Sequence, residues 1–131
     1  MSKPLHIDQF AVGLSDTDAA GRIYFARLLE RAHEAYEAFL RSVHLPIETW
    51  IADGPQLPIV HAEADFLASM TLGHELRVSL MVYKLGRTSF TLDYRFLGTD
   101  GDLLATARTV HVALSNGEPV PLPERLREVL L

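Results

Sequence analysis

The sequence predicts an α+β fold in which a curved antiparallel sheet of about five strands wraps around one long helix. One stretch has apolar residues three and four positions apart, which is the period of an amphipathic helix. Most other stretches alternate apolar and polar residues, which is the period of a strand with one buried face. The chain of 131 residues has the length of one domain, so we expect a single domain over residues 1–131.

The first half of the chain contains the predicted helix. Residues 5–14 are expected to form the first strand, and the polar turn 15–21 follows it. Residues 24–43 have helical periodicity, set by Phe25, Leu28, Leu29, Ala32, Tyr36, Phe39, Leu40 and Val43. A helix of that length spans about 30 Å, enough to cross a small sheet. Pro46 ends the helical pattern, and a short segment around Trp50 follows.

The second half of the chain is predicted to form strands. Residues 60–66, 76–83 and 90–96 alternate apolar and polar side chains, and residues 103–114 do so less regularly. The last three of these stretches are joined by short turns that each contain a glycine, so we expect them to form an antiparallel meander. Residues 123–131 are amphipathic and predict a brief C-terminal helix.

This arrangement predicts self-association. One sheet over one helix makes a thin domain, and an open sheet leaves two edge strands with unpaired backbone groups. Pairing of edges or packing of faces between copies is the usual solution, so we expect an oligomer.

The composition argues against several classes of protein. Twelve Lys and Arg residues against 17 Asp and Glu residues give a net charge of −5, whereas proteins that follow phosphate backbones carry a basic excess, so we expect no nucleic-acid partner. The absence of cysteine excludes disulfides and thiolate nucleophiles and fits a reducing cytoplasm. The N-terminus lacks the apolar core of a signal peptide, and no apolar run exceeds four residues. These features predict a soluble cytoplasmic protein without a membrane span.

The turn before the long helix is the best candidate for chemistry. Asp18 precedes a helix N-terminus, where the first backbone N–H groups lack partners and favour negative charge. A carbonyl facing those groups would be polarised, and Asp18 would act on it as a general base or as a nucleophile that forms a mixed anhydride. Gly21 would allow a ligand or a second chain to approach the backbone closely. The alternative is that Asp16 or Asp18 merely caps the turn or the helix.

The run SDTDAAGRIYFA at 15–26 resembles the signature of hotdog-fold acyl-CoA thioesterases of the 4-hydroxybenzoyl-CoA thioesterase type. The run HEAYE at 33–37 is most similar to the branch that hydrolyses 1,4-dihydroxy-2-naphthoyl-CoA in quinone biosynthesis. Residues 58–66, 85–90 and 105–112 also resemble the family, so the likeness covers essentially the whole chain.

The resemblance implies roles for individual residues. Asp18 would be the catalytic carboxylate, and the backbone N–H near Phe25 would polarise the thioester carbonyl. Gly21 and Tyr24 would shape the same pocket, and the active site would lie between the subunits of a homodimer or a homotetramer. Coenzyme A would enter as part of the substrate, and no separate cofactor or metal is expected. Arg22 departs from the family pattern, in which an apolar residue is frequent, and would alter the pocket mouth or reach solvent.

Two pairs of polar side chains suggest other chemistry more weakly. His33 and Glu37 have i, i+4 spacing on the helix, which fits a metal pair or the acid–base pair of a hotdog dehydratase. Because no third ligand accompanies them, an ordinary polar helix face is the favoured interpretation. His61 and Glu63 share one strand face, for which a solvated or subunit-interface surface is favoured over catalysis.

Trp50 and Arg87 are candidates for substrate contacts. Trp50, the single tryptophan, would contact an aromatic acyl group, although packing in the core or at an interface is the favoured alternative. Arg87 would bind the phosphates of coenzyme A, since a guanidinium matches phosphate geometry, and an exposed turn arginine is an equal alternative.

We therefore expect an acyl-CoA thioesterase that releases a free acid and coenzyme A, with an aromatic acyl group favoured by resemblance alone. A thioester has a good leaving group, so one carboxylate, one water and an oxyanion site suffice. The absence of cysteine and of a G-x-S-x-G elbow fits such a minimal site. The alternatives are a thioesterase for short-chain or carrier-protein-linked acyl groups and a non-catalytic acyl-CoA-binding module.

Overall fold

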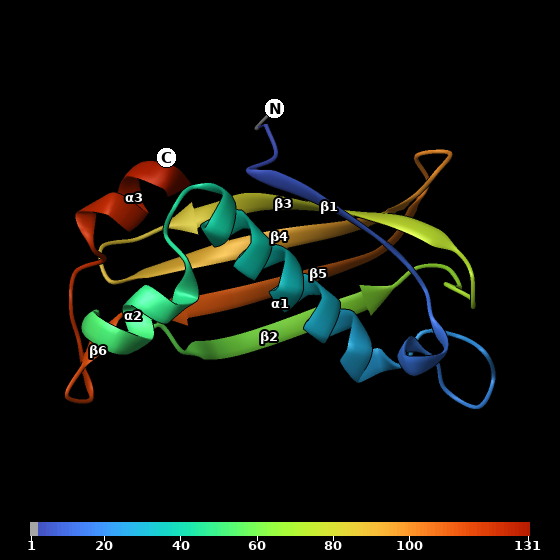
Figure 1. Ribbon diagram of the computed structural model, residues 1–131, viewed down its shortest axis with the longest axis horizontal. Helices are drawn as coiled ribbons and strands as arrows, with labels where there is room; N and C mark the ends of the chain where they lie inside the picture. Colours follow the sequence, from blue (N-terminus) through green and yellow to red (C-terminus); the bar gives the residue numbers. More distant parts are fainter. Residues whose placement is uncertain (1–2) are drawn as a thin grey trace.

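A computed structural model describes residues 3–131 (Figure 1). The helices and strands follow one another along the chain as β1 (His6–Ala11), the 3-10 turn η1 (Leu14–Asp16), α1 (Phe25–Ser42), α2 (Ile47–Asp53), β2 (Ile59–Phe66), β3 (Glu75–Leu85), β4 (Ser89–Gly98), β5 (Leu103–Val112), β6 (Leu114–Ser115), β7 (Glu118–Pro119) and α3 (Glu124–Leu130).

Five strands form one antiparallel sheet in the order β1-β3-β4-β5-β2, and α1 lies across one face of it (Figure 1). The predicted fold class is confirmed, and so is the meander, because β3, β4 and β5 are neighbours in the sheet. The strands β1 and β2 form the two edges. The short strands β6 and β7 pair separately, and the predicted C-terminal helix is present as α3.

The core lies between α1 and the sheet. The helix buries one face, made of Leu28, Ala32, Ala35, Tyr36, Phe39 and Leu40. From the sheet, buried side chains on alternate positions of β3, β4 and β5 meet this face, among them Leu80, Leu92, Tyr94, Phe96 and Ala105. Burial of each large apolar side chain stabilises the fold by about 1.5–3 kcal/mol, which is why the helical and strand periods in the sequence determine this packing.

The structure corrects two boundaries of the predicted elements and adds one helix. The first strand ends at Ala11 rather than at residue 14, because the chain turns through η1. The helix begins at Phe25, since Tyr24 keeps an extended backbone with φ −70° and ψ 136°. The segment around Trp50 is itself a helix, α2.

The strand β2 differs most from its prediction. Its alternation predicted one buried face, yet within the protomer seven of its eight residues are exposed and Ala64 is only partly buried. The physical reason is its place at the sheet edge, where only β5 pairs with it and α1 covers it little. The exposed apolar side chains include Ile59, Val60 and Phe66.

Candidate active site

The predicted turn is a tight hairpin over residues 17–23. Thr17 and Ile23 are bridged at its base, and the Asp18 N–H donates to the Arg22 carbonyl over 2.8 Å. The Gly21 N–H donates to the Asp18 carbonyl over 3.0 Å, which closes the loop. Gly21 has φ +76°, a conformation that other residues rarely adopt. A side chain at Gly21 would meet no atom within 4 Å, so within the protomer the backbone conformation, not space, requires this glycine.

The Asp18 carboxylate is exposed, and only one of its two oxygens accepts hydrogen bonds from the described residues. Its Oδ1 accepts the backbone N–H groups of Ala20 at 2.9 Å and of Arg22 at 3.2 Å, so it stabilises the turn as the capping alternative proposed. Its Oδ2 accepts no hydrogen bond from any residue in the described part of the chain. One oxygen therefore orients the side chain while the other stays available for a ligand or a water.

Unpaired backbone donors lie at the start of α1. Tyr24 is the residue before the helix, and its side chain makes no capping hydrogen bond to any part of residues 3–131. The Tyr24 N–H donates a hydrogen bond to the Asp16 carbonyl over 2.8 Å. The Phe25 N–H, in contrast, has no acceptor within residues 3–131. Phe25 is 64% exposed, and its ring lies 4.7 Å from that of Tyr24. This helix end is thus open to an oxygen ligand and carries the positive end of the helix dipole.

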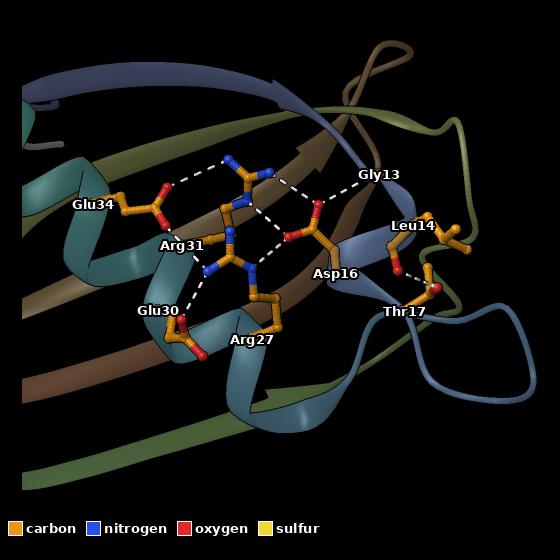
Figure 2. A network of polar contacts seen from close by, with 8 residues as sticks. All are labelled: Gly13, Leu14, Asp16, Thr17, Arg27, Glu30, Arg31 and Glu34. Carbon is orange, nitrogen blue, oxygen red and sulfur yellow. Dashed lines mark hydrogen bonds and ion pairs between the residues drawn. The ribbon is translucent and has the colours of Figure 1, made fainter.

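Asp16 behaves differently from Asp18. Its carboxylate is fully buried and binds Arg27 and Arg31 of α1 together with the Gly13 N–H (Figure 2). Burial raises the pKa of Asp16, but hydrogen bonds from Arg31, Gly13 and Arg27 outweigh that effect and hold its pKa well below the usual range. Sequence reasoning treated Asp16 only as a possible cap, because the two arginines that neutralise it follow 11 and 15 residues later.

Trp50 and Arg87 lie at the other end of the sheet from Asp18. In Figure 1 the turn before α1 is on the right, whereas α2 and the β3–β4 connection are on the left. The 18 residues of α1 span about 27 Å at 1.5 Å per residue, so one protomer does not bring these side chains to Asp18. Arg87 has an exposed side chain, and its carbonyl accepts hydrogen bonds from Leu122 and Arg127.

Trp50 contributes to a groove of about 590 Å³ between α1, α2 and the start of β2. Its wall includes His33, Tyr36, Trp50, Ile51, Gln56 and Ile59. The Tyr36 hydroxyl and the Trp50 indole N–H are buried and have no hydrogen-bond partner within residues 3–131. Sequence reasoning assigned Tyr36 to the core and missed the groove, because its walls come from three separate elements.

The other polar pairs do not assemble a metal site in the described part of the chain. His33 stacks on Tyr36 with ring centroids 5.9 Å apart, while Glu37 pairs with Arg41 at 3.7 Å. His61 and Glu63 form an exposed pair on β2 at 3.0 Å. Residues 3–131 contain no group of three or more His, Cys, Asp or Glu side chains placed to hold a metal ion.

Within residues 3–131, no helix is both long enough and apolar enough to cross a lipid bilayer. The cytoplasmic location expected from the sequence stays a prediction.

Comparison with known families assigns the chain to a protein superfamily. Residues 12–130 match the thioesterase-like superfamily. The chain belongs to this superfamily. The family predicted from the turn motif and the downstream runs is therefore confirmed, and the turn that carries Asp18 lies within the matched region.

This thioesterase-superfamily member is similar to proteins named as acyl-CoA hydrolases or thioesterases. It is 40% identical over 126 residues to the 1,4-dihydroxy-2-naphthoyl-CoA hydrolase of Synechococcus elongatus, covering 93% of this chain and 92% of that protein. Its structure matches the crystal structure of a 1,4-dihydroxy-2-naphthoyl-CoA thioesterase from Synechocystis with a TM-score of 0.89, at 37% identity over 95% of this chain and 94% of the other. A gentisyl-coenzyme A thioesterase matches with a TM-score of 0.84 and 25% identity, over 95% and 98% of the two chains.

Proposed function

We propose that this protein hydrolyses the thioester bond of an aromatic acyl-CoA, with 1,4-dihydroxy-2-naphthoyl-CoA as the substrate. The observation that carries the proposal is the junction of the 17–23 hairpin with α1, where a free carboxylate oxygen and an unpaired helix N–H belong to one turn. The 40% identity to a hydrolase of that substrate over almost the whole chain supports the choice of acyl group.

In this mechanism the thioester carbonyl oxygen accepts the Phe25 N–H, and the helix dipole stabilises the negative charge that develops on it. Asp18 then removes a proton from a water that attacks the carbonyl carbon. The carbon–sulfur bond breaks, and the coenzyme A thiolate takes the proton from Asp18. In the second route Asp18 attacks the carbon itself and the carbon–sulfur bond breaks, which forms a mixed anhydride and releases the coenzyme A thiolate. Water then hydrolyses the anhydride to the free acid and the Asp18 carboxylate, and the proton that this step releases goes to the thiolate. Both routes use the oxygen of Asp18 that the turn leaves free.

We further propose that the complete site forms between two copies of the chain. The Asp18 hairpin lies beside the Phe66 end of β2, since Ile23 bonds to Met70 and a groove joins Arg22 to Phe66. The groove with Trp50 lies at the other end, beside Ile59.

Antiparallel pairing of β2 with the β2 of a second copy puts each Ile59 end beside the Phe66 end of the other chain. The two-fold axis is then perpendicular to the sheet and keeps both helices on one face. Each Asp18 hairpin approaches the aromatic groove of the other chain in that arrangement. The exposed edge and apolar side chains of β2 support it, because an unpaired apolar edge strand favours association.

Complementation tests the shared site. The Asp18→Asn substitution removes the carboxylate, and His33→Trp fills the groove from an exposed position on α1. Co-expression with two different tags allows the mixed dimer to be purified. It should regain about half of the wild-type activity, because one of its two sites keeps both intact halves. An inactive mixed dimer contradicts a site made from two chains. Glu37→Trp is the matched control, since it adds the same bulk outside the groove wall and should stay active.

A thiol-release assay tests the reaction and the acyl group. The kcat/KM for 1,4-dihydroxy-2-naphthoyl-CoA should exceed the values for gentisyl-CoA, short-chain acyl-CoA and acyl-carrier-protein thioesters. Asp18→Asn should reduce kcat by about a thousandfold and leave the fold intact, as expected for removal of the group that activates the nucleophile. Binding of acyl-CoA without thiol release would instead identify a non-catalytic module.

A further inference from the structure

The segment that carries Asp18 has one buried residue. Between Gly13 and Ala20 the side chains are exposed or half-buried except for that of Asp16, which is fully buried. A loop is normally held by apolar side chains that insert into the core. Here the inserted group is a carboxylate, and its burial is possible because it is fully paired.

The Asp16 carboxylate joins three parts of the chain (Figure 2). Its Oδ1 accepts Arg27 Nε at 2.6 Å and Arg31 Nε at 3.2 Å, and its Oδ2 accepts Arg31 Nη2 at 2.9 Å. Oδ2 also accepts the Gly13 N–H at 2.8 Å, which closes η1. The Arg31 guanidinium therefore binds both carboxylate oxygens, an arrangement that fixes distance and orientation together.

The two arms of the hairpin are anchored differently. The returning arm is bonded through its backbone to the segment before β3, since Ile23 donates to the Met70 carbonyl and Leu72 donates to the Gly21 carbonyl. The leading arm over residues 14–18 makes hydrogen bonds within the hairpin and η1, and its Asp16 carbonyl also accepts the Tyr24 N–H just before α1. Among the described residues, its side-chain connection to α1 runs through Asp16.

We propose that Asp16 is a positioning residue that sets the distance between the Asp18 carboxylate and the Phe25 N–H. Arg27 and Arg31 lie in the first two turns of the helix that begins at Phe25, so the ion pairs connect the arm with Asp18 to the helix with the oxyanion donor. This inference rests on the proposed function. It adds that the turnover step, not substrate binding, depends on the buried carboxylate.

Asp16→Asn tests this role because it keeps the shape of the side chain and removes its charge. The amide oxygen can still accept hydrogen bonds, but the NH₂ group faces guanidinium donors and cannot pair with them. We expect kcat to fall at least about tenfold and KM to change less than about twofold, since small displacements of catalytic groups reduce the rate steeply. An unchanged kcat in folded Asp16→Asn overturns the inference, and so does an increase in KM alone.

Glu34→Gln is the matched control within the same network. Glu34 pairs with Arg27 at 3.3 Å and Arg31 at 3.4 Å from the solvent side, where ion pairs contribute little. Its kcat should equal that of the wild type. If Asp16→Asn fails to fold, Arg31→Lys is tested in its place. Lysine keeps the positive charge but cannot bind both carboxylate oxygens of Asp16 as the planar guanidinium does. This variant should lower kcat several-fold at constant KM, and a wild-type kcat overturns the inference.

The double variant separates this inference from the proposed function. If Asp16 acts through Asp18, Asp16→Asn should lower the rate no further in an Asp18→Asn background. A further loss there contradicts positioning while leaving the catalytic assignment of Asp18 standing. A fully active Asp18→Asn variant contradicts that assignment, and with it any role for Asp16 that acts through Asp18.

Discussion

One buried histidine should make this protein less stable in mild acid, because it is neutral in the folded state and protonated in the unfolded state. His111 on β5 is fully buried, its ring stacks on Phe90 at 4.6 Å, and its Nε2 lies 2.8 Å from the Thr109 hydroxyl. Its Nδ1 has no partner within residues 3–131. Tyr94, bonded to the same Thr109 hydroxyl, and Tyr36, with its ring 4.7 Å away, supply no negative charge. Burial and the nearby His33 lower the pKa of His111 to about 3.

The sign and size of the effect follow from this pKa. An unfolded histidine binds a proton near pH 6.5, whereas folded His111 stays neutral down to about pH 3. The stability that neutral His111 contributes is complete above pH 6.5 and is lost as the pH falls toward 3. Each pH unit in that window costs about 1.4 kcal/mol, so a change from pH 8 to pH 5 should lower the free energy of unfolding by about 2 kcal/mol through this residue.

Urea unfolding followed by circular dichroism measures this difference in wild type and in His111→Phe at one fixed protein concentration. The phenylalanine keeps a ring against Phe90 and cannot titrate, and Thr109 keeps its bond to Tyr94. The wild type should lose about 2 kcal/mol more than the variant between pH 8 and pH 5. An equal loss in both proteins would refute the reasoning, whatever the absolute stability of the variant.

Three further predictions concern other parts of the fold. Asp16 has a lowered pKa, so its contribution to stability is complete above about pH 4 and is lost as the pH falls further; wild type should lose more stability than Asp16→Asn between about pH 4 and pH 2 in the same urea assay. Phe39→Ala removes a buried ring between α1 and the sheet and should lower the free energy of unfolding by about 3–5 kcal/mol in urea titrations; a loss below 1 kcal/mol would contradict this packing. Val60→Glu adds a charge to exposed β2 and should shift sedimentation toward monomer with the monomer fold retained; an unchanged oligomer would argue against pairing through β2.

The local elements of this fold follow from short stretches of sequence. The apolar positions of α1 recur at helical spacing, and those of β3 and β4 alternate, so each stretch determines its own conformation and its buried face. The motif before α1 could likewise be recognised from consecutive residues, and with it the superfamily. The alternation of β2 was misleading, because a period of two shows what a strand can bury and not what covers it.

The sequence by itself determined the α+β class, the long helix and the turn that carries Asp18, because periodicity and turn chemistry act over a few neighbouring residues. Only the tertiary structure decided that Asp16 is a buried ion partner of Arg27 and Arg31. It also decided that Trp50 lies an entire helix length away from Asp18. Both depend on how elements distant in sequence pack together. That packing sets the distance and the burial of the charged groups, and so the energy of their interaction, and it also sets which side chains an aromatic ring can contact.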